Sequence, residues 1–257
     1  MADVLDQEWF IDRTAAEIDR MAWIADGADP RLAAPSCPGW TMAKLVKHTG
    51  TVHRWVTEIV ATRSSSPLDA RALDLGLPAK ESDYAGWLAA GAEPLAAALS
   101  AAGPDAAVWA WGASQTSGWW GRRMLHETAV HRADAELAVG TQPEFDPVAA
   151  ADGIDEFLAN LPVARRPSER LGTLPAGESL HLHATDADSD TDGEWLIRFT
   201  DGGFTWERGH AKATTAVRAP VGLLLLAAYG RIDPADERLT IFGDAALLTT
   251  WQEATAL

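Results

Sequence analysis

The chain has 257 residues, of which 47% are hydrophobic, and its formal net charge is −16 at pH 7. Its length exceeds that of the commonest single domains, so two domains are expected. The acidic balance disfavours nucleic acid or an anionic membrane surface as a partner. An anionic small substrate would therefore need a local cluster of arginines.

The composition also bears on the compartment. A single cysteine excludes an internal disulfide and is consistent with a reducing cytoplasm. The acidic start of the chain has no apolar stretch of a secretory signal. The longest apolar run, residues 221–229, is too short to span a bilayer. We therefore expect a cytoplasmic protein.

Two amphipathic helices are predicted first, over residues 4–26 and about 42–63, and Thr41 is placed to cap the second. His48 occupies a core-facing position on the apolar stripe of this second helix. A lone histidine there is usually a hydrogen-bonded core residue, and that alternative stands beside a role as a metal ligand. His53, five residues on, is interpreted as a surface or supporting residue.

A third helix is predicted over residues 85–101, ended by Gly103 and Pro104. The segment 109–118 then reads as irregular, aromatic and rich in hydroxyl groups. Trp111 in this segment and Trp119 just after it could line a cofactor pocket. A simply packed loop is an equally good interpretation.

The fourth helix, residues 119–140, carries ionisable side chains where a bundle helix should be apolar. Glu127 and His131 stand four apart, so one helical turn places both on the same face. Such a pair can bind one metal ion if another segment adds a ligand, and His48 is the candidate. The alternative is an ordinary salt bridge on a wet face.

Three further residues of the first half carry possible chemistry. Arg122 and Arg123 could bind the carboxylate of a small anionic substrate or cofactor as bidentate donors. Arg123 precedes Glu127 by one turn, so it could instead pair with that carboxylate. Cys37 could be a nucleophile, but no histidine lies beside it in sequence, which favours a buried structural thiol.

After a linker at 141–147 the pattern changes to an α+β domain with a mostly antiparallel sheet. The predicted elements are a helix at 149–161, strands at 179–185, 214–218 and 239–242, a hairpin at 196–208, a helix at 220–229, and a final helix capped by Asp244. We therefore expect a four-helix metal-binding bundle over residues 1–145 and an α+β domain over 146–257.

Two weaker patterns lie in this second half. His181 and His183 are two apart on a strand and share a face, but no third metal ligand is in view. They are therefore interpreted as strand residues, whose substitution should leave metal content unchanged. The stretch 188–193 matches the first half of an EF-hand loop, but Phe199 replaces the expected glutamate, which favours a solvated acidic loop.

Several motifs resemble the mycothiol-dependent maleylpyruvate isomerase family, in order along nearly the whole chain. They are S-C-P-G-W-T-M-A-K-L-V-K-H at 36–48, R-R-M-L-H-E-T-A-V-H-R-A-D at 122–134, H-L-H-A-T-D at 181–186, G-E-W at 193–195, L-L-L-L-A-A-Y-G-R at 223–231 and F-G-D-A-A-L-L at 242–248. The resemblance implies a DinB-like four-helix bundle followed by a domain similar to sterol-carrier proteins.

The resemblance also implies a site and a reaction. In the family a divalent metal, usually zinc, is bound by His, Glu and His, which correspond to His48, Glu127 and His131. A basic residue of the second domain is also implicated at the active site, and it corresponds to Arg231. One departure is Tyr229 before Gly-Arg, where the family more often has tryptophan. The family's thiol cofactor, mycothiol, belongs to actinobacteria, which fits the arginine- and alanine-rich composition.

The implied chemistry is addition of a metal-bound thiolate to an electrophilic carbon of a small, anionic substrate. This would give cis–trans isomerisation of a maleylpyruvate-like compound or S-transfer, as in a detoxifying mycothiol S-transferase. A different reading is a non-catalytic protein of the same fold that binds a metal or a ligand. All three alternatives remain open from the sequence.

Overall fold

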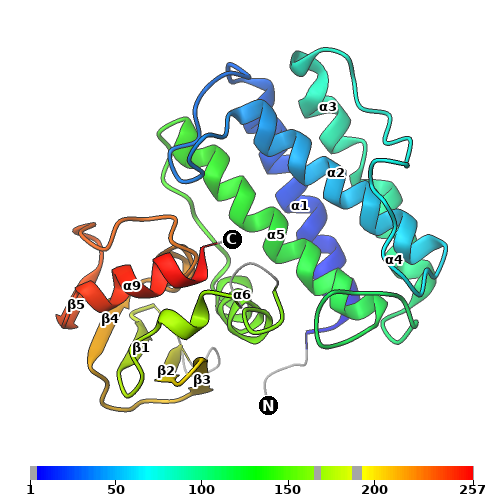
Figure 1. The fold of residues 1–257 in the computed structure, drawn as a ribbon. Coiled ribbons are helices and arrows are strands. Elements are labelled where there is room, and N and C mark those ends of the chain that lie inside the picture. Colours follow the sequence, from blue (N-terminus) through cyan, green and yellow to red (C-terminus); the bar gives the residue numbers. More distant parts are fainter. Residues whose placement is uncertain (1–4, 165–168, 187–192, 257) are drawn as a thin grey trace. The chain divides into compact units, whose positions relative to one another are not determined.

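The computed structural model describes residues 5–164, 169–186 and 193–256 (Figure 1). The chain forms two compact units, which divide between Pro143 and Glu144. The first unit is helical and the second combines helices with a five-stranded sheet, so the predicted α+β class is confirmed. The expected acidic loop at 188–192 lies outside the described residues. No helix in the described ranges is both long and apolar enough to cross a membrane.

The N-terminal unit is a bundle built from α1, α2, the successive short helices α3 and α4, and α5. Their bounds are Gln7–Asp26, Met42–Ala61, Tyr84–Ala89, Ala92–Ala102 and Ser117–Ala138. Thr41 caps α2 as predicted, because its side chain accepts a hydrogen bond from the Lys44 amide. The apolar faces of these helices share one core, whose fully buried members include Ile18, Leu45 and Ile59.

The third helix is broken, so the prediction of one continuous helix over 85–101 is wrong. Pro94 lacks an N–H, and its ring would clash with the Ala90 carbonyl in a continuous helix. The chain therefore makes a tighter turn at Gly91, whose amide donates to the Leu88 carbonyl instead of the Trp87 carbonyl. The Trp87 carbonyl that this leaves accepts a hydrogen bond from Arg54 Nη2 at 2.6 Å.

Helix α5 is the predicted fourth helix, with ends that the sequence indicated closely. The Thr116 side chain accepts from the Trp119 amide at its start. At its end, Gly140 adopts a φ of 77°, while its amide bonds to Leu137 and the Thr141 amide bonds to Glu136. This double closure is a Schellman motif, which needs glycine at the left-handed position. Most residues of α5 are buried, on every face of the helix.

A buried ionic network joins α5 to α1. The Arg132 side chain is fully buried and bonds to Glu17 of α1 through Nε at 2.6 Å. It also bonds to Glu136, one turn further along α5, and Glu136 in turn pairs with Arg20 of α1. Two arginines and two glutamates thus balance one another where the two helices pack.

The C-terminal unit begins with α6, Pro147–Asn160, capped by the Asp146 side chain. Its strands are β1 (Ser179–Ala184), β2 (Glu194–Thr200), β3 (Gly203–Arg208), β4 (Thr215–Ala219) and β5 (Thr240–Gly243). The sheet order is β3-β2-β1-β4-β5. Only the β1–β4 pair is parallel among these strands, so the sheet is mostly antiparallel, as predicted.

Helices of the same unit cover one face of this sheet. Helix α8 (Val221–Ala228) packs on β1 and β4, and α6 packs on α8. Trp251 of α9 (Ala246–Thr255) is buried against Phe157, Phe199 and Phe204. Asp244 accepts from the Ala246 amide and so starts α9 as predicted. Leu180 and Leu182 of β1 are buried, and the histidines between and after them lie on the opposite face.

The connection from β3 to β4, residues 209–214, has to cross two strands. Because β2 and β1 lie between β3 and β4 in the sheet, this short segment passes over both of them. It starts at Gly209, which has a φ of 140° and whose amide bonds to the Glu194 carbonyl. We call residues 209–214 the crossover segment.

Candidate metal centre

The structure brings together the three residues expected to bind metal. His48 Nε2 of α2 lies 2.8 Å from Glu127 Oε1 of α5. His131 Nε2 lies 3.4 Å from the same oxygen, as the four-residue spacing on α5 requires. The two imidazole rings stand 5.0 Å apart and nearly perpendicular. One donor atom from each residue fits within 4.8 Å of the others, so the three can converge on a single ion.

The donor set suits a divalent metal of the zinc class, which takes imidazole nitrogen and carboxylate oxygen. The orientation of His131 supports this fit. Its Nε2 faces Glu127, while its Nδ1 lies 2.9 Å from Asp134 Oδ2. Metal-binding histidines commonly give their second nitrogen to a carboxylate in this way. Asp134 is fully buried and follows His131 by three residues on the same helix.

The electrostatics of the cluster favour a bound cation. Burial opposes the ionisation of Glu127, but Arg123 and hydrogen bonds from His131 and His48 hold the pKa of its carboxyl well below the usual range. Burial likewise opposes a charge on His131, yet hydrogen bonds to Asp134, Cys37 and Glu127 raise its pKa well above the ordinary value. Two carboxylates thus draw positive charge to the imidazole between them.

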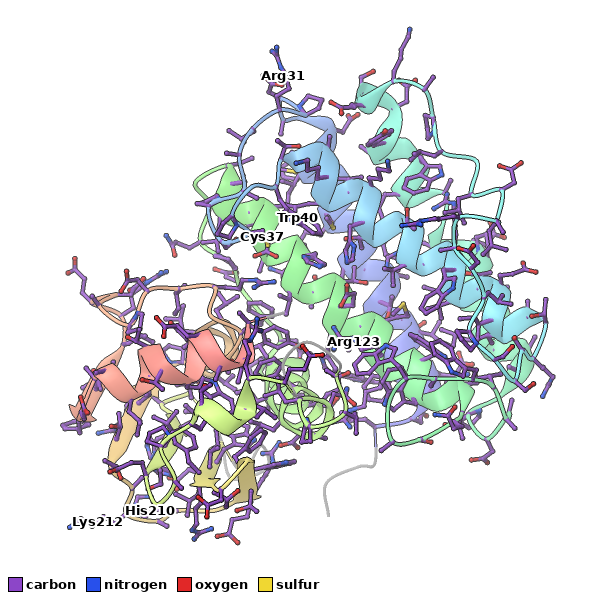
Figure 2. The ribbon with its side chains drawn as sticks, in the orientation of Figure 1. Arg31, Cys37, Trp40, Arg123, His210 and Lys212 are labelled. Atoms are coloured by element: carbon purple, nitrogen blue, oxygen red, sulfur yellow. The ribbon has the colours of Figure 1, made fainter. Side chains whose placement is uncertain are left out.

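Trp40 and Cys37 of the loop before α2 lie beside α5 (Figure 2), and side chains of this loop contact the cluster. The Trp40 ring stacks on His131 at 5.9 Å and meets His48 edge-on at 5.1 Å. Ser36 Oγ and Cys37 Sγ donate to the two oxygens of Asp134, at 2.6 and 3.1 Å. These contacts limit solvent access to one side of the cluster and hold the carboxylate that orients His131.

Cys37 has no histidine beside it in sequence, but the fold brings His131 close to it. The thiol donates to Asp134, and its sulfur lies within 4.8 Å of a ring nitrogen of His131, although 94 residues of chain separate the cysteine and the histidine. These three side chains form a second possible donor set that shares His131. Cys37 is buried, as a structural thiol would be.

The predicted arginines lie in different surroundings. Arg123 Nη2 donates to Glu127 Oε2 at 2.6 Å, so the alternative of an ion pair is what the structure shows. Arg122, the residue before Arg123, is partly buried. Arg231 belongs to the C-terminal unit, just after α8, where its Nη1 donates to the Tyr229 carbonyl at 3.3 Å. Contact of Arg122, Arg123 or Arg231 with a substrate stays a prediction.

The candidate cofactor-contacting tryptophans form an aromatic cluster at the start of α5. Trp119 meets Trp111 edge-on at 4.7 Å and Trp120 at 4.8 Å. Trp119 precedes Glu127 by eight residues, which is about 12 Å along a helix. The pair therefore lies two turns away from the candidate metal ligands, and its contact with a cofactor remains a prediction.

His53 is fully buried, so of the two interpretations the surface position is wrong and the supporting position remains. Its Nε2 lies 2.8 Å from Thr128 Oγ1, next to Glu127 on α5. Thr128 already donates its hydroxyl hydrogen to the Met124 carbonyl, so His53 must be the donor. Burial lowers the pKa of His53 to about 3, so the imidazole is neutral near pH 7. This residue supports α5 behind the candidate ligands.

A helical unit with a His–Glu–His cluster between two of its helices, joined to an α+β unit, defines a two-domain protein with a candidate metal centre. Residues 11–136 match the model of the mycothiol maleylpyruvate isomerase N-terminal domain, and residues 149–250 match that of the MDMPI C-terminal domain. The chain belongs to the mycothiol-dependent maleylpyruvate isomerase family.

Two solved structures share the fold. One is a crystal structure of the mycothiol-dependent maleylpyruvate isomerase, and the other is that of a histidine-to-alanine mutant. Each is 13% identical to this chain, with a TM-score of 0.59, and the match covers 91% of this chain and 92% of the other. No curated protein sequence matches the chain significantly.

Proposed function

We propose that this protein is a metal-dependent enzyme that uses mycothiol to act on a small, electrophilic and anionic substrate. The reaction we favour is cis–trans isomerisation of a maleylpyruvate-like compound. The observation that carries the proposal is the convergence of His48, Glu127 and His131, with Asp134 behind His131. Family membership and the name of the similar crystal structure support mycothiol as the thiol.

His48, Glu127 and His131 would hold the metal, for which zinc is the best candidate. When bound, such an ion would lower the pKa of a coordinated thiol, so that the thiol is deprotonated near neutral pH. The resulting thiolate is the nucleophile. Three protein ligands leave a position for that thiol, which is the pattern of catalytic rather than structural zinc sites.

The remaining side chains have positioning roles in this proposal. Asp134 fixes the ring of His131, and Arg123 fixes the carboxylate of Glu127 through Oε2. Trp40 covers the ring face of His131 and contacts the ring of His48 edge-on. Arg122 and Arg231 are proposed to bind carboxylates of the substrate or the cofactor as planar forks.

Two alternatives use the same site differently. In S-transfer, the product keeps the sulfur of mycothiol, as expected for a detoxification or secondary-metabolism enzyme. In a non-catalytic protein, the cluster binds a metal or ligand without turnover. We also propose a cytoplasmic location in an actinobacterial cell, because a free thiol cofactor requires a reducing compartment.

The test is turnover of maleylpyruvate with added mycothiol, with the metal content measured on the same protein. Glu127→Gln should lose at least about a hundredfold in rate, because an uncharged amide is a poor metal ligand. Glu58→Gln is the matched control, since Glu58 is exposed on α2. Full activity of a Glu127→Gln protein would refute the site. A sulfur-containing product would select S-transfer, and metal binding without turnover would select the binding protein.

A further inference from the structure

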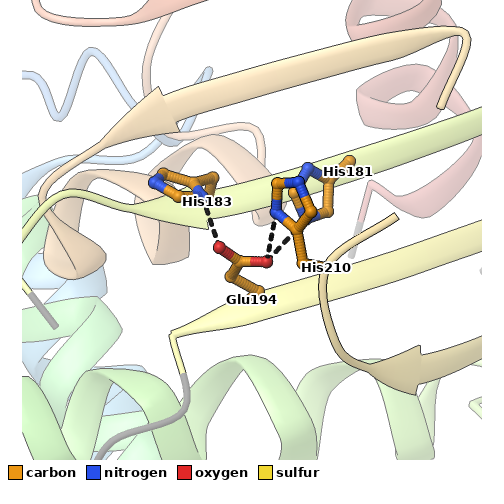
Figure 3. A group of neighbouring side chains, drawn as sticks. All are labelled: His181, His183, Glu194 and His210. Atoms are coloured by element: carbon orange, nitrogen blue, oxygen red, sulfur yellow. Dashed lines mark hydrogen bonds and ion pairs between the residues drawn. The ribbon is translucent and has the colours of Figure 1, made fainter. Parts of the chain in front are cut away.

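A second group of metal-binding side chains lies in the C-terminal unit, and it consists of His181, His183, Glu194 and His210 (Figure 3). The sheet register explains how three of them meet. His181 and His183 lie two apart on β1 and so share a face. Glu194 of β2 pairs directly with His183 across the antiparallel ladder, which places its side chain on that same face.

The Glu194 carboxylate lies at the centre of the group. Its Oε1 is 2.7 Å from His183 Nδ1, and its Oε2 is 2.7 Å from His210 Nδ1. His181 Nε2 lies 3.4 Å from Oε2. The three imidazole rings stand 5.2 to 6.2 Å from one another. Three imidazoles thus surround one carboxylate, and all four side chains carry atoms that can bind a metal ion.

His181 is the member that hydrogen bonding does not explain. It is buried, with 4% of its surface exposed, and its Nε2 makes no hydrogen bond among the described residues. The 3.4 Å approach to Glu194 is an ion-pair distance without the geometry of a hydrogen bond. A buried polar nitrogen normally has a partner, so this one indicates a missing ligand.

The crossover segment supplies the fourth side chain. Gly209 bonds to the Glu194 carbonyl and directs the chain over β2 and β1, so that His210 comes to lie beside the Glu194 carboxylate. The His210 side chain is 78% exposed, so packing does not hold it there. Its observed contact with the cluster is the 2.7 Å approach of Nδ1 to Glu194 Oε2.

We propose that His181, His183, Glu194 and His210 bind a divalent transition metal of the zinc class, at a site separate from His48, Glu127 and His131. One donor atom from each residue lies within 4.8 Å of the others. Donors on a tetrahedral zinc ion lie about 3.4 Å apart, so small side-chain rotations suffice. This revises our interpretation of His181 and His183 as simple strand residues.

The ligand number indicates what the site does. Four protein ligands complete a tetrahedral shell and leave no position for a substrate, which is the pattern of a structural zinc site. The ion would tie the crossover segment to β1 and β2. Metal binding should therefore stabilise the C-terminal unit and order residues 209–214.

The test is titration of the full-length chain with Zn²⁺ against a chromophoric chelator. The His131→Ala protein, which lacks the first site, should still bind one equivalent. The His131→Ala/His210→Ala protein should bind none, or bind more than about tenfold more weakly. Because His210 is exposed, its substitution should not disturb folding. Lys212→Ala in the same segment is the matched control, and it should keep the equivalent.

Two outcomes overturn the proposal. One is a folded His131→Ala protein that takes up no zinc, which would leave Glu194 as a simple acceptor of imidazole hydrogen bonds. The other is a double variant that keeps a tight equivalent, because the ion would then lie elsewhere. As a second measurement, Zn²⁺ should raise the melting temperature of His131→Ala but not of the double variant. If His131→Ala fails to fold, Glu127→Gln serves as the same background.

Discussion

His131 divides its two ring nitrogens between two carboxylates of its own helix. Its Nε2 faces Glu127, one turn earlier, and its Nδ1 lies 2.9 Å from Asp134, almost one turn later. The ring is therefore fixed from both sides, with one nitrogen directed towards His48.

Asp134→Asn should weaken zinc binding at the N-terminal site by about 10- to 100-fold while the stoichiometry at saturation is kept. The reason is that the amide no longer holds the Nδ1 hydrogen with a negative charge. Competition titration in a His210→Ala background isolates this site. Ser36→Ala, which removes a donor to Asp134 but keeps the carboxylate, is the control and should have a smaller effect. An unchanged affinity for Asp134→Asn would remove Asp134 from the site.

Cys37→Ser should keep mycothiol-dependent turnover within about tenfold, because the hydroxyl can still donate to Asp134 and one hydrogen bond contributes about 1 kcal/mol. Cys37→Ala should be the weaker variant, since Asp134 then loses a donor. Steady-state rates on metal-loaded, folded protein decide the matter. Complete inactivity of Cys37→Ser would make this a cysteine enzyme, with His131 and Asp134 beside the thiol.

Arg231→Lys should lower kcat/KM for an anionic substrate by about tenfold, because an ammonium group cannot reproduce a bidentate, charged hydrogen bond. Arg238→Lys is the matched control, since Arg238 pairs with Asp236 on the surface of the same unit. Rates should be compared across substrates with and without a carboxylate. A fully active Arg231→Lys protein would exclude Arg231 from substrate binding.

Arg132→Met should lower the free energy of unfolding of the N-terminal unit by about 3–5 kcal/mol, because it leaves Glu136 buried with less positive charge around it. Arg198→Met is the control for an exposed ion pair, that with Glu207, and should cost less than about 1 kcal/mol. Urea unfolding followed by circular dichroism measures both. Equal losses for the two variants would show that burial does not decide the strength of the α1–α5 network.

His53 predicts an acid-dependent loss of stability. Its pKa is about 3 in the folded protein against 6.5 for an unperturbed histidine, so between these values only the unfolded chain binds the proton. Stability should therefore fall as the pH drops below 6.5, by up to about 1.4 kcal/mol per pH unit. His53→Leu should be less stable at pH 7 but flatter between pH 7 and 5. An unchanged pH slope would mean that His53 is charged or solvated.

Much of the helical unit was predictable because its determinants are local. Thr41 and Gly140 are visible in the sequence as a cap and a stop, and both act as predicted. The break at Gly91 was missed, although Pro94 is a local signal, because an alanine- and leucine-rich stretch reads as one helix. The vacated Trp87 carbonyl is satisfied by Arg54 of α2, a contact that no local pattern contains.

The candidate sites show the same division. Glu127 and His131 share one helix, so their proximity follows from spacing alone. Cys37 approaches His131 only through the fold of the loop before α2, and His53 is buried between α2 and α5, where Thr128 of α5 faces it. His181 and His183 were seen as a pair, but Glu194 joins them through strand register and His210 through a chain crossing. Neither can be read from spacing.

The crossover segment has little slack. Three strand spacings separate β3 from β4, about 14 Å, and the seven steps from Arg208 to Thr215 reach at most about 24 Å. Turns at both ends use part of the difference, so removing three residues would leave a chain that just reaches, with no room to bend. Length variation at 209–214 is thus limited by the order of the strands.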